Sequence, residues 1–118
     1  MVVEVEGLCS TNGELKVAVF GRAGFPLDED RRVAGRRVAI TGSNVVVRLA
    51  GIAYGEYALA AYHDANLNGR LDRDWLGRPR EGYGVSGNAR RALGPPPFEA
   101  AKLRIAAPEI HCRIRLTY

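Results

Sequence analysis

Alternation of apolar and polar residues dominates this chain and predicts β-strands, because side chains two residues apart line the same face of a strand. Seven runs show this pattern: Val2–Glu6, Glu14–Phe20, Arg36–Thr41, 45–49, Glu56–His63, Phe98–Ile105 and Ile110–Tyr118. The fifth run is apolar on both faces, as expected of a central strand. The sixth contains Glu-Ala-Ala-Lys-Leu, which is also compatible with a helix.

Short strands separated by turn signals predict an all-β fold, an antiparallel two-sheet sandwich of about seven strands and of immunoglobulin-like or prealbumin-like type. The length of 118 residues fits one domain that covers residues 1–118. Segment 72–97 is rich in Gly, Pro and Arg without periodicity, so it predicts one long irregular loop, a feature that is commonly functional. The inward positions predict a core that contains Leu15, Val17, Val19, Val47, Leu49, Leu59, Ile114 and Leu116.

The nine residues from Asp64 to Asp72 carry the most informative chemistry. Oxygen-bearing side chains stand at positions 1, 3, 5 and 9, with Gly69 at position 6, as in the first nine positions of an EF-hand loop. Side chains at odd positions of a tightly coiled loop converge on one point, and Ca²⁺ prefers such oxygen ligands. The sequence therefore predicts a Ca²⁺ site formed by Asp64, Asn66, Asn68, Asp72 and the carbonyl of Arg70.

The match ends at position 12, where Trp75 stands in place of the bidentate glutamate of a full EF-hand loop. We expect Glu81, in the long loop, to complete the shell in preference to Asp74. The reduced anionic charge predicts a weak affinity of about 10⁻⁴–10⁻³ M. An alternative interpretation is that Asn68-Gly69 is a hairpin turn and that the acidic residues are solvated turn formers.

The two cysteines, Cys9 and Cys112, lie near opposite ends of the chain. Alternation predicts that both thiols point inward, where cysteine commonly behaves as a small apolar residue. Two buried thiols and a disulfide between the terminal strands are both compatible with the sequence. A zinc site is not expected, because no second Cys or His stands at ligand spacing.

The charge pattern points to no particular partner. Lys and Arg number 17 against 13 Asp and Glu, and the arginines are scattered in pairs, so a nucleic-acid partner is not favoured. No stretch reaches the roughly 18 apolar residues that span a membrane, and no signal peptide is apparent. The sequence is compatible with a cytoplasmic protein or with one whose export signal has been removed.

Three blocks of the chain carry a resemblance to a known family. They run from Tyr62 to Asp72, from Trp75 to Ser86, and over Gly94-Pro95-Pro96-Pro97-Phe98-Glu99. Together with Gly13–Phe20 and Gly24-Phe25-Pro26, they resemble the bacterial domain-of-unknown-function family 2141 along nearly the whole chain. The resemblance implies an exported β-sandwich, periplasmic or extracellular, and supplies no catalytic residues.

The leading functional hypothesis is a non-enzymatic binding or structural module of the cell envelope, or a secreted one, with a Ca²⁺ ion that stabilises the long loop. Trp75, Arg78 and Tyr83 are predicted to contact a ligand, either an unknown protein or an anionic glycan. In the alternative interpretation, Trp75, Tyr83 and Phe98 only pack the loop onto the sandwich.

Two other classes of protein are kept as alternatives. A small hydrolase would use His63 and Asp64, with Ser86 as a nucleophile. However, the residues around Ser86 lack the Gly-x-Ser-x-Gly elbow, and consecutive residues of a strand point to opposite faces. A basic nucleic-acid-binding domain would bind with a steep dependence on salt. His111 is predicted to be a surface residue of the last strand.

Overall fold

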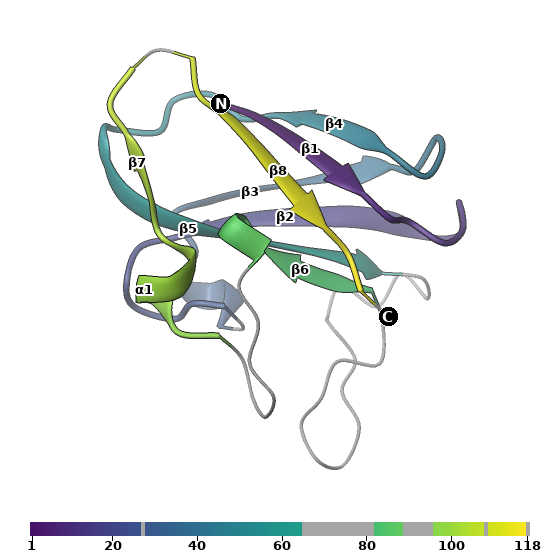
Figure 1. The fold of residues 1–118 in the computed structure, drawn as a ribbon, viewed down its shortest axis with the longest axis horizontal. Coiled ribbons are helices and arrows are strands. Elements are labelled where there is room, and N and C mark those ends of the chain that lie inside the picture. Colours follow the sequence, from purple (N-terminus) through teal and green to yellow (C-terminus); the bar gives the residue numbers. More distant parts are fainter. Residues whose placement is uncertain (27, 65–81, 89–95, 108, 118) are drawn as a thin grey trace.

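A computed structural model describes residues 1–26, 28–64, 82–88, 96–107 and 109–117 of the chain. These residues form eight strands, one short α-helix and two 3₁₀ turns (Figure 1). The elements are β1 (Val2–Glu6), β2 (Glu14–Phe20), η1 (Glu29–Arg31), β3 (Ala34–Ala39), β4 (Val45–Arg48), β5 (Gly55–Asp64), β6 (Tyr83–Val85), η2 (Ser86–Asn88), α1 (Phe98–Ala101), β7 (Leu103–Ile105) and β8 (His111–Arg115).

The strands form two sheets that lie one above the other in Figure 1. The first sheet has the order β4-β1-β8, and the second has the order β3-β2-β5-β6, with β7 also paired to β5. The predicted all-β, two-sheet fold is therefore confirmed. One pair departs from the antiparallel expectation, because β1 and β8 run parallel. Parallel neighbours need a long connection, and nearly the whole chain separates these two strands.

The main core fills the space between the sheets. Each residue that the alternation predicts to be buried is found there, with Leu15, Val19, Leu59 and Ile114 fully inaccessible to solvent. Val3 and Val5 of β1 join them and stand opposite Cys112 and Ile114 of β8. The repeated burial of every second residue is the reason that the period-two pattern predicts this core well.

A second, smaller core covers the outer face of the second sheet. Ala18, Phe20, Ala58 and Ala60 point away from the main core and are covered by Phe98, Ala101 and Phe25. The ring of Phe25 lies edge-on to the rings of Phe20 and Phe98, with centroid distances of 6.0 and 6.1 Å. This cover explains why β5 is apolar on both faces, as its sequence indicates.

Three elements differ from the predicted boundaries. Strand β3 begins and ends two residues earlier than predicted, because its pairing with β2 starts at Ala34 opposite Val19. Segment 98–105 is divided into a helical turn, α1, and a strand, β7. Strand β6 lies inside the segment predicted to be one irregular loop. With three residues, β6 is too short to show a period.

The prediction that both thiols point inward is wrong for Cys9. Strand β1 ends at Glu6, and Gly7 then adopts a φ of 84°, so the alternation does not continue beyond the strand. Leu8 is buried in the core, and Cys9 is exposed. Cys112 packs against the core and is half-buried, and each cysteine is a thiol rather than half of a disulfide.

Candidate functional site

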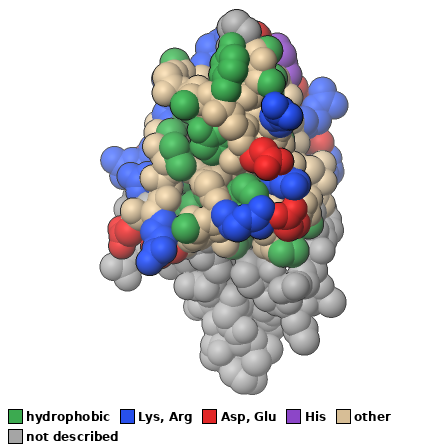
Figure 2. Space-filling view, turned by 90° about the vertical axis from the view of Figure 1, so that its left-hand side faces the viewer, with side chains coloured by type: hydrophobic (Ala, Val, Ile, Leu, Met, Phe, Trp, Pro, Cys, Tyr) green, Lys and Arg blue, Asp and Glu red, His purple; other side chains and the backbone are tan. Residues whose placement is uncertain are grey.

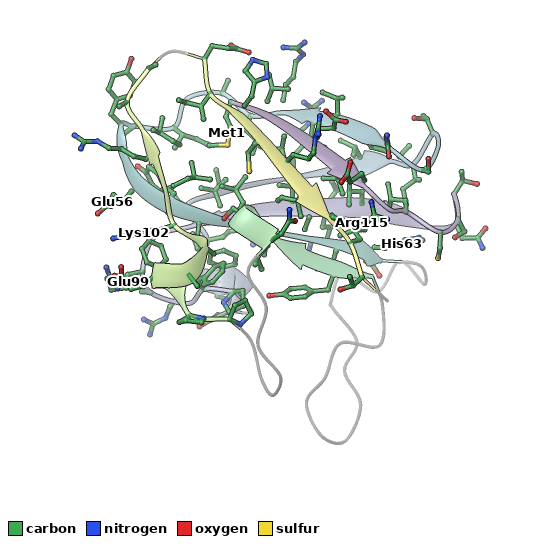
Figure 3. The ribbon with its side chains drawn as sticks, in the orientation of Figure 1. Met1, Glu56, His63, Glu99, Lys102 and Arg115 are labelled. Carbon is green, nitrogen blue, oxygen red and sulfur yellow. The ribbon has the colours of Figure 1, made fainter. Side chains whose placement is uncertain are left out.

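The predicted cation site begins at the end of β5, the longest strand of the second sheet. Leu59 and Ala61 face the main core, whereas Ala58 and Ala60 face the outer cluster. The same alternation places the next two residues, His63 and Asp64, on opposite sides of the strand, as predicted. Both side chains are buried, with 2% of His63 and 0% of Asp64 exposed. Figure 3 shows His63 at one end of β5 and Glu56 near the other.

His63 holds the neighbouring turn to the sheet. Its Nε2 atom lies 2.5 Å from the carbonyl oxygen of Asn12 and donates a hydrogen bond to it. Its backbone N–H donates to the carbonyl oxygen of Gly82 at 2.8 Å. The ring therefore fixes the connection between β1 and β2, and the backbone fixes the point at which the chain re-enters the sheet.

Ser86 has a structural role between the sheet and the helix. Its hydroxyl donates to the carbonyl oxygen of Ala101 at 2.6 Å and accepts from the N–H of Leu59 at 2.9 Å. The side chain is completely buried. Leu59 precedes His63 by four residues of an extended strand, which is roughly 13 Å. The structure therefore does not bring Ser86 within hydrogen-bond reach of His63, as a nucleophile and base require.

Asp64 is the predicted Ca²⁺ ligand that falls in the described part of the chain. The other predicted ligands lie outside the described residues: Asn66, Asn68, Arg70, Asp72 and Glu81. Within residues 1–26, 28–64, 82–88, 96–107 and 109–117, no group of three or more His, Cys, Asp or Glu side chains is arranged to hold a metal. Asp64 is a buried carboxylate at the end of a strand, and carboxylate oxygens are hard donors of the type that Ca²⁺ prefers.

Tyr83, predicted to contact a ligand, lies in β6 opposite Tyr62 and packs against the outer cluster. Its hydroxyl is buried and has no hydrogen-bond partner within the described ranges. Burial raises the pKa of this phenol far above its ordinary value. Phe98 packs in the same cluster, so the packing role that the sequence left open is observed for these two residues. Trp75 and Arg78 lie outside the described residues.

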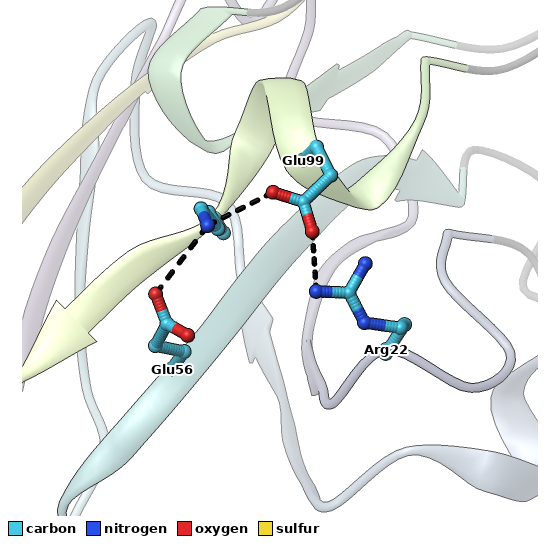
Figure 4. Close-up of polar contacts among 4 residues, drawn as sticks. Arg22, Glu56 and Glu99 are labelled. Carbon is cyan, nitrogen blue, oxygen red and sulfur yellow. Dashed lines mark ion pairs between the residues drawn. The ribbon is translucent and has the colours of Figure 1, made fainter.

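A charged network on the surface joins α1 to the elements around it (Figure 4). The carboxylate of Glu99 forms ion pairs with Arg22 and with Lys102, the latter at 2.8 Å, and Lys102 reaches Glu56 at 3.5 Å. The hydrogen bond from Lys102, followed by that from Arg22, lowers the pKa of Glu99. The hydrogen bond between Lys102 and Glu99 also raises the pKa of Lys102. All four side chains are substantially exposed, so the network orients α1 rather than forming an enclosed site.

A cavity that no sequence motif indicates lies at the opposite end of the sandwich. Its volume is about 650 Å³, and its lining comes from several segments: Met1, Val2, Arg36, Arg48, Leu49, Ala50, Gly51, Ile52, Tyr54, Ile105, Ala107, Glu109 and Ile110. Apart from Arg36, which lies within β3, these residues come from strand ends and connections, so no single segment carries a motif. Figure 2 shows hydrophobic side chains over the upper part of this end of the molecule, above a group of charged side chains.

The fold and the site define a small β-sandwich whose central strand ends in a buried carboxylate. The model of the family described as "Uncharacterized protein conserved in bacteria (DUF2141)" matches residues 3–112. The match covers nearly the whole chain, so the chain belongs to this family. Comparison with curated proteins and with solved structures gave no match. No helix in the described part of the chain is long and apolar enough to cross a membrane.

Proposed function

We propose that this protein is a non-enzymatic binding module in which a Ca²⁺ ion, held by the loop that starts at Asp64, stabilises the surface that contacts a partner. The observation that carries the proposal is the placement of Asp64. Its side chain is fully buried at the end of a strand that is bonded to β2 on one side and β6 on the other. A ligand fixed by the sheet loses little freedom when the ion binds, which favours affinity.

The backbone at both ends of the loop supports Glu81 as the ligand that completes the shell. His63, which precedes Asp64, is hydrogen-bonded to Gly82, which follows Glu81. Asp64 and Gly82, the described residues on either side of segment 65–81, therefore lie at the same end of the sheet, and Glu81 is the residue that comes directly before Gly82 in the sequence. Asn66, Asn68, Asp72 and the carbonyl of Arg70 would supply the remaining oxygen atoms. The ion would thereby tie segment 65–81 to the sandwich.

The partner surface would then be the loop that the ion orders. Trp75 and Arg78 stand in this segment, and an aromatic ring and a guanidinium are side-chain types suited to an anionic glycan or a protein. A nucleic-acid partner receives less support, because several arginines are neutralised by neighbouring carboxylates: Arg22, Arg31, Arg37, Arg113 and Arg115. The environment of Ser86 supports a non-enzymatic role, since both hydrogen bonds of its hydroxyl are engaged with the backbone.

A periplasmic or extracellular location forms part of this proposal. It rests on the family resemblance and on the weak affinity expected for the loop. Sites with dissociation constants of about 10⁻⁴–10⁻³ M are typical of extracellular modules, where Ca²⁺ is abundant.

Thermal unfolding in Ca²⁺ and in chelator tests the proposal. A ligand that binds only the native state at a hundredfold excess over its Kd stabilises that state by about 2.7 kcal/mol. With the expected Kd of about 10⁻⁴–10⁻³ M, about 10 mM Ca²⁺ is a tenfold to hundredfold excess and stabilises the native state by roughly 1.4–2.7 kcal/mol. We therefore expect about 10 mM Ca²⁺ to raise the Tm by several degrees, and the variant Asp72→Asn to lose this response. Asp28→Asn is the matched control, because Asp28 is exposed and pairs with Arg31 outside the loop. An equal response in both variants would contradict the assignment.

A further inference from the structure

The cavity at the far end of the sandwich has the size of a small-molecule site. Its volume of about 650 Å³ falls within the range of roughly 300–1,000 Å³ that is usual for such sites. It opens where β5 begins, whereas Asp64 stands where β5 ends. The ten residues of β5 extend over roughly 33 Å, so the cavity and the proposed cation loop are separate features.

The inner part of the cavity is apolar. Leu49 is buried in the main core, Ile52 packs against that core, and Ile105 is buried beside them. Tyr54, at the border of the cavity, has 61% of its surface exposed and is among the most exposed large apolar residues in the described part of the chain. An alkyl chain or a ring placed here would leave water and would cover the exposed tyrosine, and both changes favour binding.

Two arginines give this cavity a positive charge. Arg36 stands opposite Val17 in the register of β2 and β3, and its Nη1 atom donates to the carbonyl oxygen of Arg48 at 2.9 Å. This bond joins β3 to β4 across the edge of the sandwich. The hydrogen bond to Arg48 uses one of the five N–H donors of the Arg36 guanidinium. It holds the guanidinium in place and leaves its other N–H groups as donors for a ligand.

Neither Arg36 nor Arg48 forms an ion pair with a carboxylate of the described residues, in contrast to the arginines that neighbour acids elsewhere on the surface. Among the residues that line the cavity, Glu109 is the carboxylate, and it faces His111 at 3.8 Å. The cavity thus combines an apolar interior with two cationic groups that have no anionic partner in the described structure. A ligand with the complementary chemistry has an apolar body and one anionic group.

We propose that this cavity binds a small amphipathic anion, whose apolar body lies against Leu49, Ile52 and Ile105 and whose carboxylate or phosphate group is bound by Arg36 and Arg48. A guanidinium binds either group through two parallel hydrogen bonds. Tyr54 packs over the apolar body and closes one side of the site. This site is additional to the Ca²⁺ loop, and each of the two can exist without the other.

Titration of the full chain with decanoate and, separately, with decyl phosphate tests the proposal. Displacement of the fluorescent anion 1-anilinonaphthalene-8-sulfonate reports binding, and 1-decanol is the uncharged comparison. We expect at least one of the two anions to bind at least tenfold more tightly than 1-decanol. We expect Arg48→Gln to weaken its binding by about tenfold or more, since a charge-assisted hydrogen bond is lost. Tighter binding of one of the two anions would show whether the site prefers a carboxylate or a phosphate group.

Arg37→Gln is the matched control, because Arg37 follows Arg36 on the same strand but pairs with Glu14. It should alter the affinity by less than twofold. Arg36→Gln should act as Arg48→Gln does. If Arg36→Gln fails to fold, as judged by circular dichroism, Arg48→Gln carries the test, since Arg48 contributes only its backbone carbonyl to that bond. No binding of either anion at millimolar concentration, equal binding of 1-decanol, or equal losses in Arg37→Gln and Arg48→Gln would overturn the proposal.

Discussion

Replacement of Ser86 by alanine tests the account of how the two cores are joined. In the native protein the Ser86 hydroxyl accepts a hydrogen bond from the N–H of Leu59 and donates one to the carbonyl oxygen of Ala101, in a place without contact with solvent. Strand β6 ends at Val85, so the side chain of Ser86 takes over the ladder bond that the backbone no longer supplies. It also holds the last residue of α1 against the second sheet.

The Ser86→Ala variant leaves one donor and one acceptor of the backbone buried without partners. Each such group costs about 1–3 kcal/mol, so the expected loss in the free energy of unfolding is roughly 2–6 kcal/mol. For a domain of about this size, 1 kcal/mol corresponds to a change in Tm of roughly 4–8 °C, and the Tm should therefore fall by at least about 8 °C.

Urea unfolding followed by circular dichroism measures this loss through the transition midpoint, with an unchanged slope if unfolding is cooperative. Ser43→Ala is the control, because Ser43 is exposed and contributes a backbone carbonyl to the structure. Its stability should be within about 0.5 kcal/mol of the wild type. A loss below about 1 kcal/mol in Ser86→Ala would refute the buried bridge between Leu59 and Ala101.

Three further predictions concern the thiols, alkaline stability and a close approach of two strands. In the folded protein at pH 8, a disulfide reagent should modify the exposed Cys9 quickly and Cys112 slowly, because burial raises the pKa of the Cys112 thiol to about 11. Equal rates of modification would contradict this placement of the two cysteines. The ordinary pKa of this thiol is 9.0, and burial in the folded protein favours its protonated form. The contribution of this thiol to the free energy of unfolding is therefore present in full below pH 9 and is lost as the pH rises through about 11. The loss is about 2–3 kcal/mol and should be absent from a Cys112→Val variant studied in parallel. Gly84→Ala should lower the free energy of unfolding by more than about 2 kcal/mol in thermal denaturation, because its Cβ would lie 2.5 Å from the carbonyl oxygen of Arg115. The control Gly42→Ala should lower it far less, because the space around Gly42 is open. An equal Tm for these two glycine variants would show that β6 and β8 do not approach so closely.

The sequence predicts those parts of the fold that depend on local periodicity. Strands β1 and β2 have the predicted boundaries, and β5 extends one residue beyond the predicted run at each end. The parallel pairing of β1 with β8 has no local signal, because the two strands are brought together only by the folding of the whole chain. Alternation also fails as a guide beyond Gly7, where a positive φ changes the direction of the chain and leaves Cys9 exposed.

The candidate sites also differ in how far the sequence alone predicts them. Asp64 belongs to a contiguous motif at the end of a recognisable strand, so sequence alone indicates both its chemistry and its position. The cavity with Arg36 and Arg48 combines side chains from separate segments, and only the pairing of the strands brings them together. A bridging role for Ser86 is equally hidden, because both of its partners are backbone groups far away in the sequence.

The central claim, that the loop from Asp64 to Glu81 binds Ca²⁺, is tested most directly by following backbone amide resonances during a Ca²⁺ titration. We predict that the resonances of residues 64–72 shift together and saturate with a Kd of about 10⁻⁴–10⁻³ M. The response should be absent from Asp64→Asn and should be unchanged in the control Asp28→Asn. Resonances in this segment that do not move up to about ten times that concentration, or that move equally in wild type and Asp64→Asn, would contradict the claim.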